Sequence, residues 1–276
     1  MSSNQDPTIA FIGAGNMAAA LIGGIKENGY QGTIIATDLD SGKLDQLAKD
    51  FGISVTSDND QAIAQADFVV LAVKPQVMKT VCEQLAPAVQ KRKPVVVSIA
   101  AGLTADTLET WLGGDLAMVR CMPNTPALVQ TGASGLFAND RVSAEQKALA
   151  TRVFESVGIA VWVNTEAQLH AITAVSGSGP AYYFLFMEAM QKSAESLGLD
   201  PGTAAQLVAQ TALGAARMVN ETDDSPEQLR IKVSSPGGTT EQAIHSFEMD
   251  GLRNAVQQAM NACVRRSEEM AEELAQ

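Results

Sequence analysis

The feature that most constrains the fold of this chain is residues 9–20, IAFIGAGNMAAA, where an apolar strand runs into a glycine turn and then into a helix of small residues. The turn reads Gly13-x-Gly15-x-x-Ala18. A strand, a tight glycine turn and a helix together bring bare backbone N–H groups and the positive end of a helix dipole onto a bound pyrophosphate. Alone, such a string is weak evidence, because glycine turns between strands and helices are common.

The sequence that follows strengthens this interpretation. Apolar residues from Met17 to Ile25 recur at helical spacing, and Gly29 is suited to end the helix. A second apolar run, TIIATD at 33–38, ends in Asp38. An acidic residue at about this distance from the glycine turn meets the hydroxyls of an adenosine ribose. Together these features predict a dinucleotide site.

The alternation of strand and helix continues through the first half of the chain. Further strands are expected at residues 53–56, 66–75, 94–102 and 116–127, and a last one at 156–166. The runs at 66–75 and 94–102 are almost wholly apolar, as in strands that helices cover on both faces. Six strands alternating with helices before the last one predict an α/β, Rossmann-like, doubly wound sheet that is mostly parallel.

Ligands of such sheets bind at the carboxyl ends of the strands, and those ends carry the unusual residues of this chain. Lys74-Pro75 fits either an ordinary strand exit, since proline cannot continue a ladder, or a loop that lines the cofactor. Asn124 lies between two prolines, where it either shapes a turn or holds a nicotinamide or substrate with its amide. Arg120 lies within a strand and can pair with an acidic neighbour or contact a ligand.

After about residue 164 the strand pattern stops and helical periodicity replaces it. We expect a dinucleotide-binding domain at 1–164 and an all-α domain at 165–276. The apolar face of the helix AYYFLFMEAM at 181–190 indicates a core or a subunit interface. A helical domain of this size buries such faces with difficulty alone, so we expect a homodimer. Its helices are expected at residues 166–176, 180–197, 201–219, 226–233, 239–249 and 251–274.

Two segments interrupt these helices, VSGSGPAY at 175–182 and VSSPGGTTE at 233–241. In each, glycines, hydroxyl residues and a proline directly precede a helix, which leaves the helix start exposed. In the second, the N–H groups beyond Pro236 and the hydroxyls of Thr239 and Thr240 can hold a carboxylate. The alternative is a plain helix cap with a proline turn.

Composition excludes several classes of function. The net charge of −12 argues against nucleic acid and anionic membranes as partners, because both need a dense surface of Lys and Arg. The three cysteines are odd in number and have no C-x-x-C spacing, and only two histidines are present, so we expect no disulfide framework and no metal. We expect neither a signal peptide nor a membrane helix. We therefore expect the protein to be cytoplasmic.

Several motifs together carry a family resemblance. SSPGGTT at 234–240 is the most specific, RCMPNTPA at 120–127 comes next, and FIGAGNM at 11–17 is the least specific. AVKP at 72–75, SIAAG at 98–102 and SGSGPAY at 176–182 occur in the same order over nearly the whole chain. The chain resembles pyrroline-5-carboxylate reductase, the last enzyme of proline synthesis.

The resemblance implies reduction of 1-pyrroline-5-carboxylate to L-proline with NADPH or NADH, by a dimer that commonly assembles further into a decamer. Asp223 would approach the substrate from the preceding loop, and Ser178 is a further substrate candidate. The substrate segment would include Gly238, Thr239 and Thr240. The cofactor would contact Ile12, Gly13, Ala14, Gly15, Asn16, Met17, Thr37, Asp38, Ala72, Val73, Lys74, Pro75, Ile99, Ala100 and Ala101, with Asn124 as a further candidate.

The available side chains agree with that reaction. Hydride passes from the nicotinamide to C5 of a cyclic imine, whose ring nitrogen must be protonated or hydrogen-bonded. Thr240, the candidate catalytic residue, can donate a hydrogen bond to that nitrogen while N–H groups around Gly238 and Thr239 bind the carboxylate, so positioning supplies much of the rate. Whether Thr240 transfers a proton or only orients a protonated iminium stays open.

Asp38-Leu39-Asp40 departs from the pattern of relatives that prefer the phosphorylated cofactor, which present small hydroxyl or basic residues there. A carboxylate should repel a 2′-phosphate and favour ribose hydroxyls, although Ser41 and Lys43 could still receive the phosphate. Both coenzymes therefore stay open at this point.

Two rival functions can be compared with this interpretation. A β-hydroxyacid dehydrogenase has a similar organisation but needs a lysine after the second glycine motif, where this chain has Tyr183 and, more than two turns later, Lys192. A non-catalytic nucleotide sensor would not need the SSPGGTT segment, which is suited to a small acid.

Overall fold

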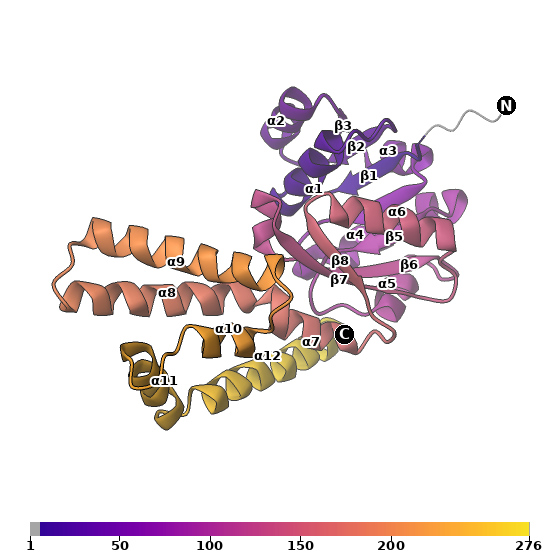
Figure 1. Cartoon of the computed structure of the whole chain (residues 1–276). Helices are drawn as coiled ribbons and strands as arrows, with labels where there is room; N and C mark the ends of the chain where they lie inside the picture. Colours follow the sequence, from indigo (N-terminus) through magenta and orange to yellow (C-terminus); the bar gives the residue numbers. More distant parts are fainter. Residues whose placement is uncertain (1–5, 276) are drawn as a thin grey trace. The chain divides into compact units, whose positions relative to one another are not determined.

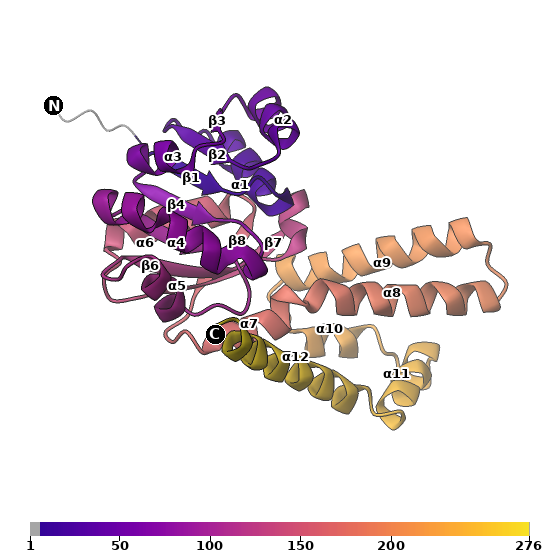
Figure 2. The same ribbon diagram turned by 180° about the vertical axis from the view of Figure 1, so that it is seen from behind.

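The computed structural model describes residues 6–275, and the predicted ends of the two domains at residues 1 and 276 lie outside this range. The chain forms two compact units, Met1–Ser178 with Cys263–Gln276, and Gly179–Ala262. Figures 1 and 2 show the sheet and its helices in the first unit and a purely helical second unit. The predicted fold class, a parallel α/β sheet followed by a helical region, is confirmed.

The first unit is built on one eight-stranded sheet in the order β3-β2-β1-β4-β5-β6-β7-β8. All neighbouring strands are parallel except β6 and β7, which are antiparallel. The reversal of strand order at β1 and β4 is the switch point of a doubly wound sheet. The strands are β1 (Ile9–Ile12), β2 (Ile34–Thr37), β3 (Ser54–Thr56), β4 (Phe68–Leu71), β5 (Val95–Ser98), β6 (Met118–Met122), β7 (Gly132–Ala138) and β8 (Gly158–Trp162).

Helices cover both faces of this sheet (Figures 1 and 2). Alternate residues of a strand point to opposite faces, so Phe11 joins a core with Leu21 and Phe154, whereas Ile12 joins the other core with Met78. Burial on both faces explains the unbroken apolar strands of the sequence. The helices are α1 (Asn16–Glu27), α2 (Ser41–Phe51), α3 (Asn59–Gln65), α4 (Pro75–Arg92), α5 (Ala105–Trp111), α6 (Ala144–Glu155) and α7 (Gln168–Ile172), with a 3-10 helix at Thr125–Val129 and a π-helical turn at Thr173–Gly177.

The strand β7 was not predicted from the sequence. Its residues, GASGLFA, are mostly small and lack the β-branched pattern that indicates a strand. The structure shows why they are small: a Cβ on Gly135 would lie 2.6 Å from Ile172 of α7, so a larger residue would clash with that helix. The helix expected over residues 166–176 is present from Gln168 to Gly177, but it changes from the α-helix α7 to a π-helical turn after Ile172.

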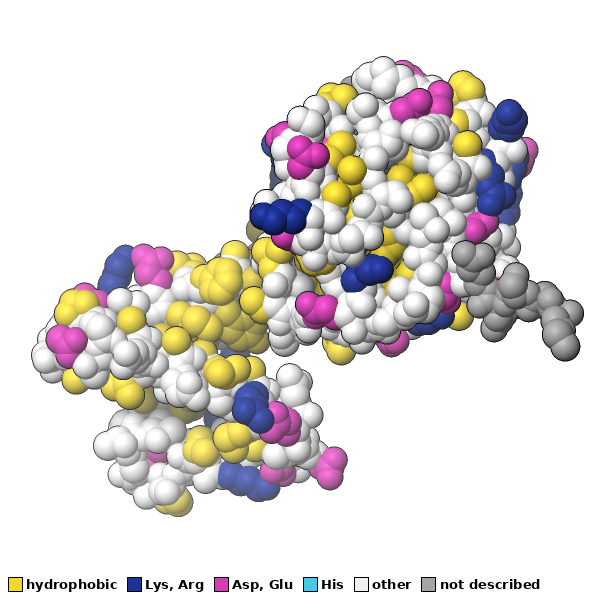
Figure 3. All heavy atoms as spheres, turned by 90° about the horizontal axis from the view of Figure 1, so that it is seen from above, with side chains coloured by type: hydrophobic (Ala, Val, Ile, Leu, Met, Phe, Trp, Pro, Cys, Tyr) yellow, Lys and Arg dark blue, Asp and Glu magenta, His cyan; other side chains and the backbone are white. Residues whose placement is uncertain are grey.

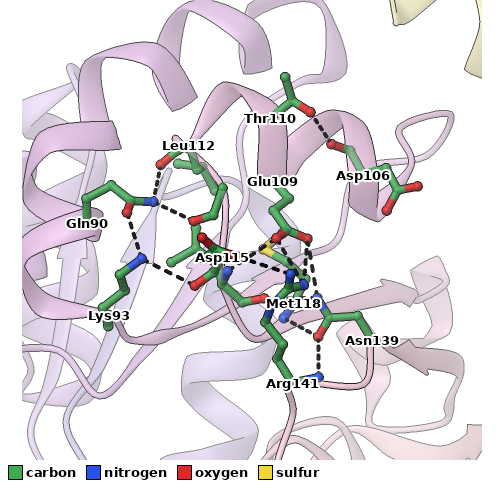
Figure 4. Close-up of polar contacts among 12 residues, drawn as sticks. Gln90, Lys93, Asp106, Glu109, Thr110, Leu112, Asp115, Met118, Asn139 and Arg141 are labelled. Atoms are coloured by element: carbon green, nitrogen blue, oxygen red, sulfur yellow. Dashed lines mark hydrogen bonds and ion pairs between the residues drawn. The ribbon is translucent and has the colours of Figure 1, made fainter.

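A polar cluster fixes the amino end of β6 (Figure 4). The side chain of Asn139 donates to the Leu116 carbonyl and accepts from the Met118 N–H. Arg141 lies 3.1 Å from a Glu109 carboxylate oxygen and 3.2 Å from one of Asp115. These bonds join α5 to the chain after β7 at the edge opposite to the strand ends where ligands of such sheets bind, so the cluster is structural.

The second unit contains α8 (Gly179–Ser196), α9 (Pro201–Glu221), α10 (Pro226–Lys232), α11 (Thr239–Met249) and the start of α12 (Leu252–Leu274). The helices α8 and α9 lie side by side (Figures 1 and 2). Large apolar side chains remain exposed on this unit, including Tyr183, Leu185, Leu213 and Met218, and Figure 3 shows hydrophobic side chains gathered over these helices. Such a surface is typical of a subunit interface. Among residues 6–275, no helix has the length and apolar character needed to cross a membrane.

Candidate active site

The parallel strands end in register at one edge of the sheet. Ile12 of β1 pairs with Thr37 of β2 and Leu71 of β4, and Leu71 in turn pairs with Ser98 of β5. The segments after these residues therefore lie together at the carboxyl edge of the sheet, where doubly wound folds bind ligands. They contain the cofactor candidates Gly13, Ala14, Gly15, Asn16, Met17, Asp38, Ala72, Val73, Lys74, Pro75, Ile99, Ala100 and Ala101.

The turn between β1 and α1 has room for an anion. Gly13 has φ +104° and a Cβ there would lie 2.8 Å from the Ala72 carbonyl oxygen, so the turn lies directly against the exit of β4 and requires glycine. A Cβ on Gly15 would meet nothing within 4 Å. Among residues 6–275, no side chain caps the first N–H groups of α1, and the first turn of α1 contains no acidic residue. This start fits the pyrophosphate of a dinucleotide, because open space faces unpaired donors.

Asp38, directly after β2, is bonded to the glycine turn itself. Its carboxylate accepts from the Ala14 N–H and from the Asp40 N–H, both at 2.9 Å, and lies 3.7 Å from the Lys43 ammonium. Partial burial would raise the pKa of Asp38, but the backbone hydrogen bonds and Lys43 outweigh it, so the pKa lies below its ordinary value of 3.8. The carboxylate is therefore ionised and fixed.

The exit of β4 bears on the two interpretations of Lys74-Pro75 made from the sequence, and a loop that lines the cofactor stays a prediction. Pro75 is the first residue of α4, so the strand ends here as an ordinary strand exit would. Lys74 precedes it with an exposed side chain that forms no ion pair with any of the described residues. The start of α4 also has no side-chain cap. A lysine without an ion-pair partner among the described residues thus follows the strand exit that lies against the turn after β1.

Arg120 is held by an acid and not left for a ligand. Its guanidinium lies 3.0 Å from Glu166, and the same carboxylate oxygen accepts from the Ala105 N–H at 2.6 Å. Burial lowers the pKa of Arg120, and Glu166 opposes that change. Glu166 therefore joins β6 to the start of α5, close to the cofactor candidates after β5. The sequence did not single out Glu166, because 46 residues separate it from Arg120.

Asn124 uses both ends of its amide inside the protein. Its oxygen accepts from the Ala133 N–H of β7 at 2.9 Å, and its nitrogen donates to the Ser176 carbonyl at 3.0 Å. The side chain is buried and supports the π-helical turn that leads into the first glycine segment. In that segment Ser178 is half-buried, with its hydroxyl 3.3 Å from the Cys263 sulfur. The amide of Asn124 thus fixes this segment to the sheet.

In the second unit, the SSPGGTT segment forms an open start of α11. Gly238 precedes the helix, and no side chain caps it. The N–H of Gly237 donates to Glu241 and that of Gly238 to the Ser235 carbonyl, so the unpaired donors begin at Thr239 and not at Gly238. Within residues 6–275, the hydroxyls of Thr239 and Thr240 make no hydrogen bond. The segment therefore offers both N–H and O–H donors to a small acid.

Two neighbouring aspartates of this unit differ in their surroundings. Asp224 forms an ion pair with Lys232, whereas Asp223 is exposed and has no ion-pair partner in the described part of the chain. Asp223 is thus the carboxylate that stays available for a ligand. As far as residues 6–275 show, no group of His, Cys, Asp and Glu is arranged to hold a metal ion.

Comparison with known proteins gives concordant results for both halves of the chain. A family model described as pyrroline-5-carboxylate reductase dimerisation matches residues 166–270, and one described as NADP oxidoreductase coenzyme F420-dependent matches residues 8–102. A pyrroline-5-carboxylate reductase of Pseudomonas aeruginosa is 53% identical over 271 residues, which are 98% of this chain and 99% of the relative.

Two solved structures are similar over nearly their full length. A pyrroline-5-carboxylate reductase from Coxiella burnetii has a TM-score of 0.92 and 48% identity, covering 96% of this chain and 98% of that one. Plasmodium falciparum pyrroline carboxylate reductase with NADP bound has a TM-score of 0.84 and 29% identity, covering 98% of this chain and 100% of that one.

Proposed function

Because the chain belongs to the pyrroline-5-carboxylate reductase family, it reduces 1-pyrroline-5-carboxylate to L-proline with NADPH or NADH, and we propose which of its residues carry out this last step of proline biosynthesis. The observation that carries the proposal is which helices start without a side-chain cap. Side chains cap α2, α3, α5, α6, α9 and α10, whereas the five-residue helix α7 starts without such a cap. The longer helices α1, α4 and α11 also start without a side-chain cap. Two of these open starts lie at the carboxyl edge of the sheet, and the third is the SSPGGTT segment.

The carboxyl edge of the sheet is the proposed cofactor site. The start of α1 and the Lys74 ammonium bind the pyrophosphate, and Asp38 accepts hydrogen bonds from the adenosine ribose. The nicotinamide supplies the hydride when it is bound. The proposed set is Ile12, Gly13, Ala14, Gly15, Asn16, Met17, Thr37, Asp38, Ala72, Val73, Lys74, Pro75, Ile99, Ala100, Ala101 and Asn124.

The start of α11 is the proposed substrate site. The free N–H groups of Thr239 and Thr240 bind the carboxylate of the imine, with Gly238 shaping the turn, since a Cβ there would lie 2.9 Å from the Ser235 carbonyl. The Thr240 hydroxyl donates a hydrogen bond to the ring nitrogen, which makes C5 more electrophilic. Asp223 and Ser178 complete the proposed set of substrate residues.

The helical region forms a homo-oligomer, in agreement with its match to a dimerisation model and its exposed apolar surface. We propose further that dimers assemble into a decamer, that the protein works in the cytoplasm, and that the functional domains are 1–164 and 165–276. The exposed apolar side chains of the second unit support a dimer. The three cysteines of the chain form no disulfide among the described residues, which is consistent with a reducing compartment.

The experiment that tests the site is steady-state oxidation of NAD(P)H by pyrroline-5-carboxylate. Replacing Thr240 with Ala removes the donor to the ring nitrogen, and we expect kcat/KM to fall by about a hundredfold, as for loss of one preorganised donor. Ser246 lies exposed on the same helix, so Ser246→Ala is the matched control and should keep the wild-type rate. A Thr240→Ala enzyme as fast as the control would remove Thr240 from the mechanism.

A further inference from the structure

We propose that this chain selects NADH over NADPH, and that Asp38 and Asp40 exclude the 2′-phosphate. The inference rests on the proposed function for the position of the adenosine ribose beside Asp38. The two coenzymes differ only by that phosphate, so the groups after β2 decide between them. Three features of this loop all act against the phosphate.

The first feature is that the Asp38 carboxylate is rigid. One oxygen is bonded to the Ala14 N–H inside the glycine turn, and the other to the Asp40 N–H two residues further along the chain. The side chain is only 17% exposed. The carboxylate therefore cannot turn away from an incoming phosphate without leaving two backbone donors unpaired. Ribose hydroxyls can donate to such a carboxylate, whereas a phosphate dianion has no proton to give.

The second feature is that another carboxylate already occupies the start of α2. Asp40 accepts from the N–H groups of Gly42 and Lys43, at 2.9 and 3.3 Å. These donors would otherwise form an anion site at a helix start next to the ribose. The contrast with α1 is direct, because α1 begins with uncapped donors and no acid.

The third feature is that the nearest base is already paired. Lys43, one of the two phosphate acceptors suggested by the sequence, lies 3.7 Å from Asp38. Two carboxylates and one ammonium leave this loop with a net charge of −1, because −2 and +1 sum to −1. Of the two side chains that the sequence suggested for holding the phosphate, only Ser41 remains. Its hydroxyl is a single neutral donor, which does not compensate a doubly charged phosphate. Leu39 is fully exposed between the two acids and offers an apolar surface to the adenine of either coenzyme.

Binding of each coenzyme in the absence of pyrroline-5-carboxylate tests the proposal. We expect titration of the protein, followed by nicotinamide fluorescence, to give a Kd for NADH about a hundredfold below that for NADPH, because placing like charges side by side costs several kcal/mol. The ratio of the two Kd values should move toward one at high salt, because salt screens the repulsion between the carboxylates and the phosphate. If the wild-type protein bound both coenzymes equally, or bound NADPH more tightly, that measurement alone would overturn the proposal.

Variants assign the effect to the two acids. Asp38→Asn and Asp40→Asn remove the charges, so each should lower the NADH preference at least about tenfold. The amide oxygen of Asn can keep both backbone bonds at position 40, where one oxygen accepts both, but only one of the two bonds at position 38, where each oxygen accepts one. Asp45 is exposed one turn further along α2, and Asp45→Asn is the charge-matched control that should keep the wild-type ratio. A wild-type ratio in both Asp38→Asn and Asp40→Asn would also contradict the proposal.

The two proposals fail separately in these experiments. If the protein bound NADH selectively but did not reduce pyrroline-5-carboxylate, the proposed function would be wrong and the selectivity would stand. If it reduced the imine faster with NADPH and bound NADPH more tightly, the function would stand and the selectivity would be wrong.

Discussion

The ion pair between Arg120 and Glu166 gives the sharpest prediction about stability. The Arg120 side chain is 8% exposed and that of Glu166 is 24% exposed. Replacing Glu166 with Ala leaves the guanidinium without its carboxylate and the Ala105 N–H without its acceptor. Removing one partner of a buried pair costs about 3–5 kcal/mol, and the partial exposure of Glu166 favours the lower end, so we expect the free energy of unfolding to fall by about 3 kcal/mol.

Urea unfolding followed by circular dichroism measures this loss, at one fixed protein concentration because the protein is an oligomer. A loss of about 3 kcal/mol corresponds to a midpoint of thermal unfolding roughly 6–12 °C lower. Glu273→Ala is the control, because it breaks an exposed ion pair with Arg266 and should leave the free energy of unfolding almost unchanged.

A double variant separates the lost pair from the lost volume. Arg120→Met with Glu166→Leu replaces both charges by apolar groups, so it should be more stable than Glu166→Ala alone. If Glu166→Ala unfolded at the same urea concentration as the wild type, the pair would contribute nothing and the reasoning would be refuted.

Three further predictions follow from the same edge of the sheet. Gly13→Ala places a methyl group 2.8 Å from the Ala72 carbonyl at φ +104°, so we expect NADH binding to weaken at least about tenfold in fluorescence titration, and an unchanged Kd would remove the turn from the site. Asn124→Ala leaves the Ala133 N–H and the Ser176 carbonyl unpaired, so the free energy of unfolding measured in urea should fall by about 2–3 kcal/mol. An almost unchanged free energy of unfolding would mean that water replaces the amide. Because the pKa of Asp38 is lowered on folding, its ionised carboxylate stabilises the folded protein above about pH 4. This stabilisation is lost as the pH falls through the lower pKa of the folded state, so the difference in unfolding free energy between wild type and Asp38→Asn should shrink below pH 4. A difference that stayed constant with pH would contradict this reasoning.

Local chemistry explains why much of the fold could be predicted. Gly29 follows the end of α1 with φ +77°, and Pro75 starts α4, so glycine and proline marked these boundaries in the sequence. Periodicity predicted the helices after residue 178 to within a few residues. The glycine turn and Asp38 were visible because their ligand chemistry depends on short spacings.

The features that the sequence did not reveal depend on contacts between distant segments. The strand β7 consists of small residues because α7 packs against it, and nothing within β7 itself records that contact. The role of Glu166 depends on Arg120 and Ala105, which are 46 and 61 residues away. Likewise, the bond from Ala14 to Asp38 joins two motifs that the sequence showed only separately.

The chain leaves the α/β unit after Ser178 and returns to it at Cys263, and the side chains of these two residues touch at 3.3 Å. In topological terms the helical unit is an insertion whose two junctions coincide. The end of α12 then packs Met270 and Leu274 against Gly102, beside the loop after β5. A deletion from the carboxyl terminus would therefore damage the dinucleotide-binding half first, whereas excising residues 179–262 and joining the junctions directly would leave that half with all its own parts.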